Sequence, residues 1–158
     1  MTLREFLLQN APRAEQEKRR RQSREEWIAA VDRLLAQLRA WLSEGDTVEF
    51  LDIESLDFEK REQGLGTYHI RGLAIHFGES TVKVVPVGRN VLAHLGPYAE
   101  AGHEKAEGRV DITNGSYKYF LYRKLTNDSE QWFVQDERSE IRPLDRERLE
   151  AILQDLLS

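Results

Sequence analysis

The chain has 158 residues, of which 40% are hydrophobic and 32% charged, and its formal net charge is −5. This length suits one globular domain with its own core, and the net negative charge argues against a dedicated nucleic-acid binder, which needs clustered cations. The absence of cysteine excludes a disulfide, a thiolate zinc site and a cysteine nucleophile, and it fits a cytoplasmic location.

The first residues predict a short helix. Thr2 and Glu5 have the spacing of a capping box. Three apolar residues share one face of the turns that follow: Leu3, Phe6 and Leu7. We expect Pro12 to interrupt this helix and to begin a new one, because proline suits the first helical turn. Arg4 and Glu5 break the apolar start, so it lacks the apolar core of a secretory signal. No run approaches the ~18 apolar residues of a membrane span.

The clearest helical pattern lies between residues 27 and 45. Apolar residues recur there at spacings of four and three: Trp27, Val31, Leu34, Leu38 and Trp41. Such a stripe is typical of an amphipathic helix that packs on a sheet, and Gly45 is a natural C-terminal stop. Residues 1–45 are therefore predicted to form a helical region.

The stretch "EQEKRRRQSREEW", residues 15–27, admits two structures. A second capping box, Ser23 with Glu26, would start the helix there and leave residues 11–22 as a tail. Alternatively, one helix spans about 12–43, which is favoured where an acidic residue precedes a basic one by four positions. Two such pairs support the continuous helix: Glu15 with Arg19, and Glu17 with Arg21.

The basic stretch and a tyrosine-rich segment together raise an alternative, nucleic-acid hypothesis, in which cations hold phosphates and aromatic rings stack on bases. Its candidate residues are Lys18, Arg19, Arg20, Arg21 and Arg24, with Tyr117 and Lys118 in "YKYFLYRK". Against it, glutamates interleave with the arginines, and the tyrosine segment lacks the glycines of the RNA-recognition strand motif. We therefore interpret the cluster as a solvated surface and the segment as a core strand.

Residues 46–137 predict an antiparallel sheet of five to seven strands. Strands are expected at 47–58, 67–77 and 81–87, in a hairpin around Asn114-Gly115, and at 132–137. The short connections imply a meander. Gly72 is a candidate bulge, and Pro86, which cannot donate to a ladder, should place its strand at an edge or end it. Residues 88–108 are expected to form an irregular loop with at most a short strand.

The end of the chain predicts another helix, over residues 143–158. Asp145 is its expected N-cap, and Leu144 and Leu149 flank the cap as a hydrophobic staple. The whole chain, 1–158, is thus predicted to be a single α+β domain. In it the antiparallel sheet packs against a long N-terminal helix and a C-terminal helix.

Catalytic candidates are confined to the irregular loop and the strand after it. They are His94, His103, Arg109 and Asp111. These side chains could form an acid–base site if the fold brings them together. No histidine pair has the spacing of a helical zinc site, and only a bulge at Gly72 would place His69 and His76 on one strand face. We expect no metal and no cofactor.

The apolar rows of the helices and strands suggest more hydrophobic surface than one sheet face covers, and no catalytic motif is visible. We therefore expect a non-catalytic protein–protein interaction or assembly module, which forms a homodimer or binds another protein. The residues expected at the interface are Trp27, Val31, Leu34, Trp41 and Tyr119. The alternatives are the nucleic-acid hypothesis and an enzyme with a site in residues 88–111.

Overall fold

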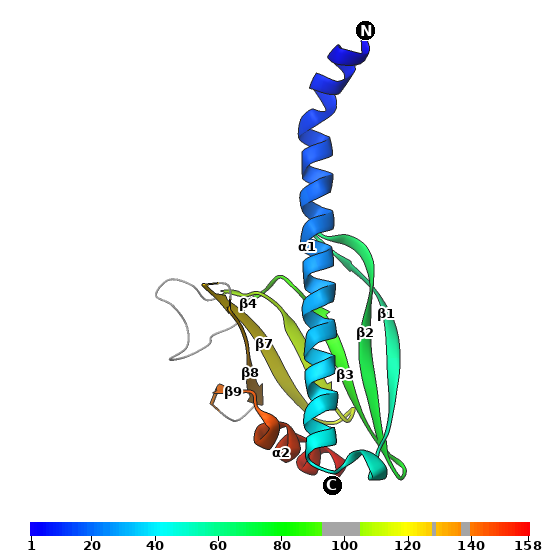
Figure 1. Cartoon of the computed structure of the whole chain (residues 1–158), viewed down its shortest axis with the longest axis vertical. Coiled ribbons are helices and arrows are strands. Elements are labelled where there is room, and N and C mark those ends of the chain that lie inside the picture. Colours follow the sequence, from blue (N-terminus) through cyan, green and yellow to red (C-terminus); the bar gives the residue numbers. More distant parts are fainter. Residues whose placement is uncertain (93–104, 128, 137–139) are drawn as a thin grey trace.

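The structure is a computed structural model, which describes residues 1–92, 105–127, 129–136 and 140–158 (Figure 1). Within these residues the protein consists of a long helix α1 (Leu3–Glu44), a seven-stranded antiparallel sheet and a C-terminal helix α2 (Arg146–Leu157). The predicted α+β architecture is confirmed.

The strands of the sheet follow one another in chain order, and each is antiparallel to its neighbours. They are β1 (Asp52–Glu62), β2 (Gly66–Phe77), β3 (Ser80–Gly88), β6 (Arg109–Thr113), β7 (Lys118–Thr126), β8 (Ser129–Asp136) and β9 (Arg142–Pro143). The 3-10 helix η1 (Val48–Phe50) precedes β1, and β4 (Val91–Leu92) pairs with β5 (Lys105–Ala106) in a separate small sheet. The predicted meander and its hairpin around Asn114-Gly115 are confirmed.

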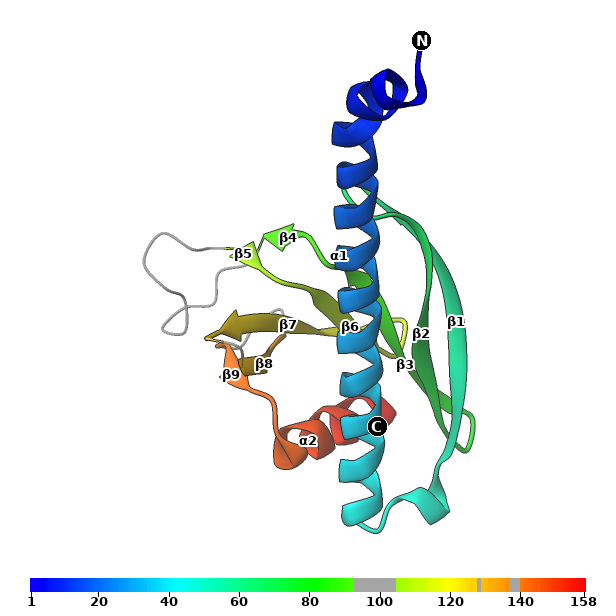
Figure 2. The same ribbon diagram turned by 45° about the horizontal axis from the view of Figure 1, so that its top comes forward.

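The core lies between one face of this sheet and the C-terminal half of α1, with α2 beside it (Figure 1, Figure 2). Helix α1 buries one row of side chains: Trp27, Ala30, Val31, Leu34, Leu35, Leu38 and Leu42. Helix α2 adds Leu149, Ile152, Leu153 and Leu156. Burial of each large aliphatic side chain contributes roughly 1.5–3 kcal/mol.

The predicted N-cap of α2 is confirmed, because the backbone N–H of Arg148 donates to Asp145 Oδ1 at 2.7 Å.

The expected break at Pro12 was wrong, because α1 continues through it from Leu3 to Glu44. A proline inside a helix removes one backbone hydrogen bond and tends to bend the axis, and the dark blue end of α1 bends away from the rest in Figure 2. The continuous alternative for residues 13–26 is the correct one. The capping box at Thr2 and Glu5 is confirmed by both of its hydrogen bonds, 3.0 and 3.2 Å long.

Two expectations for the sheet were also wrong. Pro86 lies in β3, which continues to Gly88 and is an interior strand between β2 and β6. The pairing of β3 with β2 ends at Val84, and its register with β6 shifts between Pro86 and Gly88, so Pro86 lies where the ladders are interrupted. Gly72 pairs with Leu56 in regular register and forms no bulge. A Cβ at Gly72 would lie 2.3 Å from the carbonyl oxygen of Val84, so this glycine permits close approach of two strands.

Candidate interaction surfaces

Helix α1 projects far beyond the sheet at its N-terminal end (Figure 1). We call residues 1–22 the arm, because none of them is fully buried and all but Asn10 and Arg20 are exposed. At 1.5 Å per residue, the helical part of the arm is about 30 Å long. Just after the arm, Arg24 Nη1 donates to the carbonyl oxygen of Leu65 at 2.9 Å, which attaches the helix to the β1–β2 turn.

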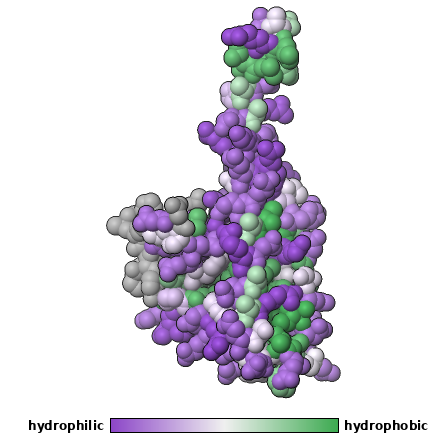
Figure 3. Space-filling view, viewed as in Figure 1, coloured by the Kyte–Doolittle hydropathy of each residue, from purple (hydrophilic) through white to green (hydrophobic). Residues whose placement is uncertain are grey.

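The end of the arm carries a group of exposed apolar side chains, which we call the tip. Its members are Met1, Leu3, Phe6, Leu7 and Leu8, with exposed fractions between 51% and 81%. They form the green surface at the top of Figure 3. Apolar patches of this kind, rimmed by polar residues, mark sites of interaction on soluble proteins.

Between the tip and the sheet, the arm is basic. Residues 1–24 contain seven Lys or Arg and three Glu, a net charge of +4. Two of the cations form ion pairs along the helix, Arg19 with Glu15 at 3.8 Å and Arg20 with Glu17 at 3.2 Å. Lys18 and Arg21 are exposed.

The other nucleic-acid candidates lie at the opposite end of the molecule. Tyr117 and Lys118 follow the β6–β7 turn, where Asn114 Nδ2 donates to the carbonyl oxygen of Leu156 in α2 at 3.0 Å. Figure 1 places this turn near α2, away from the arm. The structure therefore does not bring the basic cluster and the tyrosine segment together.

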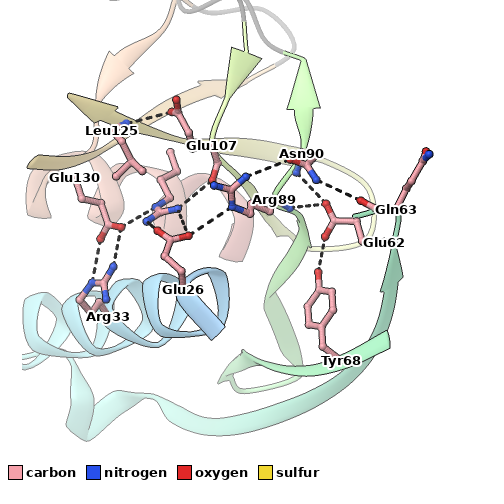
Figure 4. A network of polar contacts seen from close by, with 11 residues as sticks. Glu26, Arg33, Glu62, Gln63, Tyr68, Arg89, Asn90, Glu107, Leu125 and Glu130 are labelled. Carbon is pink, nitrogen blue, oxygen red and sulfur yellow. Dashed lines mark hydrogen bonds and ion pairs between the residues drawn. The ribbon is translucent and has the colours of Figure 1, made fainter. Parts of the chain in front are cut away.

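The base of the arm is fixed by an ion network around one buried arginine (Figure 4). The guanidinium of Arg123, on β7, is only 1% exposed. Its Nε donates to Glu130 Oε2 at 2.7 Å, and its two other nitrogens donate to the carboxylate of Glu26 on α1. Arg33 donates twice to Glu130, at 3.3 and 3.0 Å, and Arg89 Nε lies 3.5 Å from Glu26. Salt bridges thus join α1 to β7 and β8.

The charges of this network shift the pKa values of its two carboxyl groups. Burial raises the pKa of Glu26, but hydrogen bonds and the positive charges of Arg123 and Arg89 outweigh burial, so the pKa lies below its usual value. Burial likewise raises the pKa of Glu130, and Arg33 and Arg123 together lower it below its usual value. Both groups are therefore held as carboxylates.

This network was not predicted from the sequence, although the position of Arg123 in its strand gave one indication of it. Arg123 has the same strand parity as the buried Leu121, so an unbroken strand points both toward α1. A buried guanidinium requires carboxylate partners. Glu130 lies only seven residues from Arg123, on the neighbouring strand β8. Glu26 lies 97 residues away on α1, and the sequence alone does not identify it as a partner.

A groove lies at the opposite end of α1 from the arm. Its volume is about 680 Å³, and its apolar lining includes Leu42, Phe50, Leu51, Phe77, Leu153 and Leu157. Phe50 and Phe77 are 65% and 50% exposed, and Figure 3 shows apolar surface at this end. The groove is assembled from the end of α1, η1, the end of β2 and α2.

The surroundings of the groove are acidic. Residues 43–52, which contribute several of its walls, contain four acidic residues and no basic one. Glu150 lines the groove from α2, and Glu79 lies in the turn after Phe77. The basic part of the arm and the acidic border of the groove therefore lie toward opposite ends of α1.

The residues expected at a partner interface differ in burial. Trp27, Val31 and Leu34 are buried between α1 and the sheet, where a partner does not reach them in this arrangement. Trp41 and Tyr119 are half-buried at the surface. The Tyr119 hydroxyl donates to Asp155 Oδ2 at 2.6 Å, and burial together with this hydrogen bond raises the pKa of Tyr119 to about 12.

Of the catalytic candidates, the structure brings Arg109 and Asp111 together. Arg109 donates from Nε and Nη2 to the two oxygens of Asp111, at 2.8 and 2.9 Å, and its guanidinium lies 4.4 Å from the ring centre of Phe120. The hydrogen bonds from Arg109 to Asp111 raise the pKa of Arg109 above its usual value. His94 and His103 lie outside the described residues, so the predicted acid–base site stays a prediction.

The other histidines are kept apart. His69 lies 3.8 Å from Asp57, whereas His76 lies 2.9 Å from the hydroxyl of Thr81 and 3.4 Å from Glu54. Among the residues that the structure describes, no group of three histidine or acidic side chains could hold a metal ion. In the same part of the chain, no helix has the length and apolar character needed to cross a membrane.

The chain matches no known family model. Neither the curated proteins nor the solved structures contain a match to it.

Proposed function

We propose that the protein is a non-catalytic protein–protein interaction or assembly module that acts in the cytoplasm and binds its partner through the arm. The observation that carries this proposal is the exposed apolar tip at the end of the projecting helix. Leu3, Phe6 and Leu7 share one face at three- and four-residue spacing, which is the pattern of a helix that inserts into a groove.

The energetics of the arm support a bound partner. Most of the stability of a helix in a protein comes from tertiary packing, of which the arm has little. A proline in the helix interior, such as Pro12, also costs about 3 kcal/mol relative to alanine. A partner that packs on the tip would supply stabilisation that the arm lacks on its own. The ion network around Arg123 would hold the base of the arm in a fixed direction.

Two variants of the full-length chain test the proposal. Leu3→Glu with Phe6→Glu places charges on the apolar face of the tip, and Gln9→Glu with Gln16→Glu adds the same charge elsewhere on the arm. Complexes would be detected by light scattering at micromolar concentration and by a photo-crosslinker at position 7, which neither variant changes. We expect the tip variant to lose complexes that the control variant keeps. A monomeric wild-type chain that crosslinks to no protein through position 7 would contradict the proposal.

A second candidate function is nucleic-acid binding, favoured by the +4 charge of residues 1–24 and by the exposed Lys18 and Arg21. Replacement of Arg19, Arg20 and Arg21 by Glu should then abolish binding to an oligonucleotide, while Arg146→Glu on α2 should leave it unchanged. Binding should also weaken steeply as salt rises. Salt-independent affinity would exclude this function.

A further inference from the structure

We propose that the groove at the C-terminal end of α1 receives the tip of a second copy of this chain, so that molecules associate head to tail. This inference rests on the proposed function, since it names the partner of the arm. The tip offers apolar side chains on one helical face, and the groove offers an apolar recess of about 680 Å³. That volume is in the range of sites that enclose a ligand.

Charge complementarity identifies the second copy as the occupant. The arm, with its net charge of +3, approaches a groove bordered by Glu150, Glu79 and the acidic segment 43–52. Opposite potentials of this kind steer association and select the orientation of the partners. Pairing of two arms with each other would instead bring two basic surfaces together, which is unfavourable at low salt.

The helix dipole of α1 also favours a head-to-tail contact. The tip is at the N-terminal end of α1, which carries partial positive charge, and the groove includes Gly45 at the C-terminal end of the same helix, which carries partial negative charge. In a head-to-tail contact, the positive end of one α1 approaches the negative end of the next.

The geometry makes the contact intermolecular. The tip and the groove lie at opposite ends of one continuous 42-residue helix, so a molecule cannot fill its own groove (Figure 1). A contact between two unlike surfaces produces rings or open chains rather than a two-fold dimer. The interface is formed by a few side chains, so we expect weak association that declines as salt rises.

Complementary variants provide the test. The tip variant, Leu3→Glu with Phe6→Glu, keeps an intact groove, and a groove variant, Phe50→Glu with Phe77→Glu, keeps an intact tip. All four side chains are at least half exposed, so the fold should tolerate these changes. Self-association of each variant alone should be at least about tenfold weaker than that of the wild-type chain.

An equimolar mixture of the two variants should form heterodimers in sedimentation velocity, because one intact tip and one intact groove remain. The heterodimers should grow no further. A mixture that stays monomeric, while the wild-type chain associates, would overturn the head-to-tail contact. A wild-type chain that stays monomeric would also overturn it. The proposed function would survive either result if position 7 still crosslinks to another protein and the tip variant abolishes that crosslink.

Discussion

Arg123 is the most deeply buried charged side chain in the described residues. Its guanidinium is 1% exposed and lies between the carboxylates of Glu26 and Glu130. Removal of a charge from water is costly, and it is offset here by several charge-assisted hydrogen bonds. Because the folded protein lowers the pKa of both Glu26 and Glu130, its stability should depend on pH.

We predict that Glu26→Gln and Glu130→Gln each reduce the free energy of unfolding at neutral pH by about 1–3 kcal/mol. The folded-state pKa of both groups lies below the usual value. Their stabilisation is therefore fully present above the unfolded-state pKa near 4.5 and is lost as pH falls through the folded-state pKa. Urea unfolding at a series of pH values should show a shallower acid dependence in each variant.

The matched control is Glu59→Gln, at an exposed position of β1. It should leave both the stability at neutral pH and its acid dependence unchanged. If Glu26→Gln and Glu130→Gln keep the full acid dependence of the wild-type chain, the network does not contribute to stability in the way described.

Among the elements, the arm is the part of α1 that tertiary packing supports least. None of residues 1–22 is fully buried, and Pro12 removes a backbone hydrogen bond from this segment. Its helical structure depends on the capping box at Thr2 and on pairs such as Glu15–Arg19, each worth a few tenths of a kcal/mol. Segments with so few buried contacts open readily.

We predict that Pro12→Ala stabilises the arm without stabilising the body of the protein. Alanine restores the hydrogen bond and avoids a cost of about 3 kcal/mol that proline imposes inside a helix. Hydrogen exchange should become slower in residues 3–16 and stay unchanged in Trp27–Leu42. Equal slowing of exchange in both segments would show that the arm and the body open together, which would contradict the prediction.

The elements that the sequence predicted correctly are those determined by local pattern. The stripe from Trp27 to Trp41, the Asp145 cap and the Asn114-Gly115 turn each depend on residues close together in the chain. The errors at Pro12 and Pro86 have a different origin. In both cases the surrounding structure accommodates a residue whose local preference is to end a helix or strand.

The candidate surfaces were predictable to different degrees. The apolar face of Leu3, Phe6 and Leu7 is visible in the sequence, but its exposure depends on where the sheet ends along α1. The groove combines side chains from four separate segments, so local pattern does not reveal it. Trp27 was expected at an interface, and a stripe in the sequence does not distinguish a core from a binding surface.

At the scale of the whole molecule, the protein divides into a body that contains the core and an arm that adds little to it. The buried row of α1 starts at Trp27, and the helix contacts the β1–β2 turn through Arg24. Ser23 is a good N-cap residue, so a chain that starts there can still begin its helix properly. Stability and association should therefore be separable.

We predict that deletion of residues 1–22 leaves the free energy of unfolding within about 1 kcal/mol of the full chain, because the deletion removes no fully buried side chain. Urea unfolding followed by tryptophan fluorescence would measure it, and self-association should be lost in the same preparation. Deletion of residues 1–27 is the comparison, since it also removes Trp27 and Glu26 and should cost at least about 3–5 kcal/mol. If the shorter deletion destabilises the protein as much as the longer one, the arm packs against the body in solution and is not free to bind a partner.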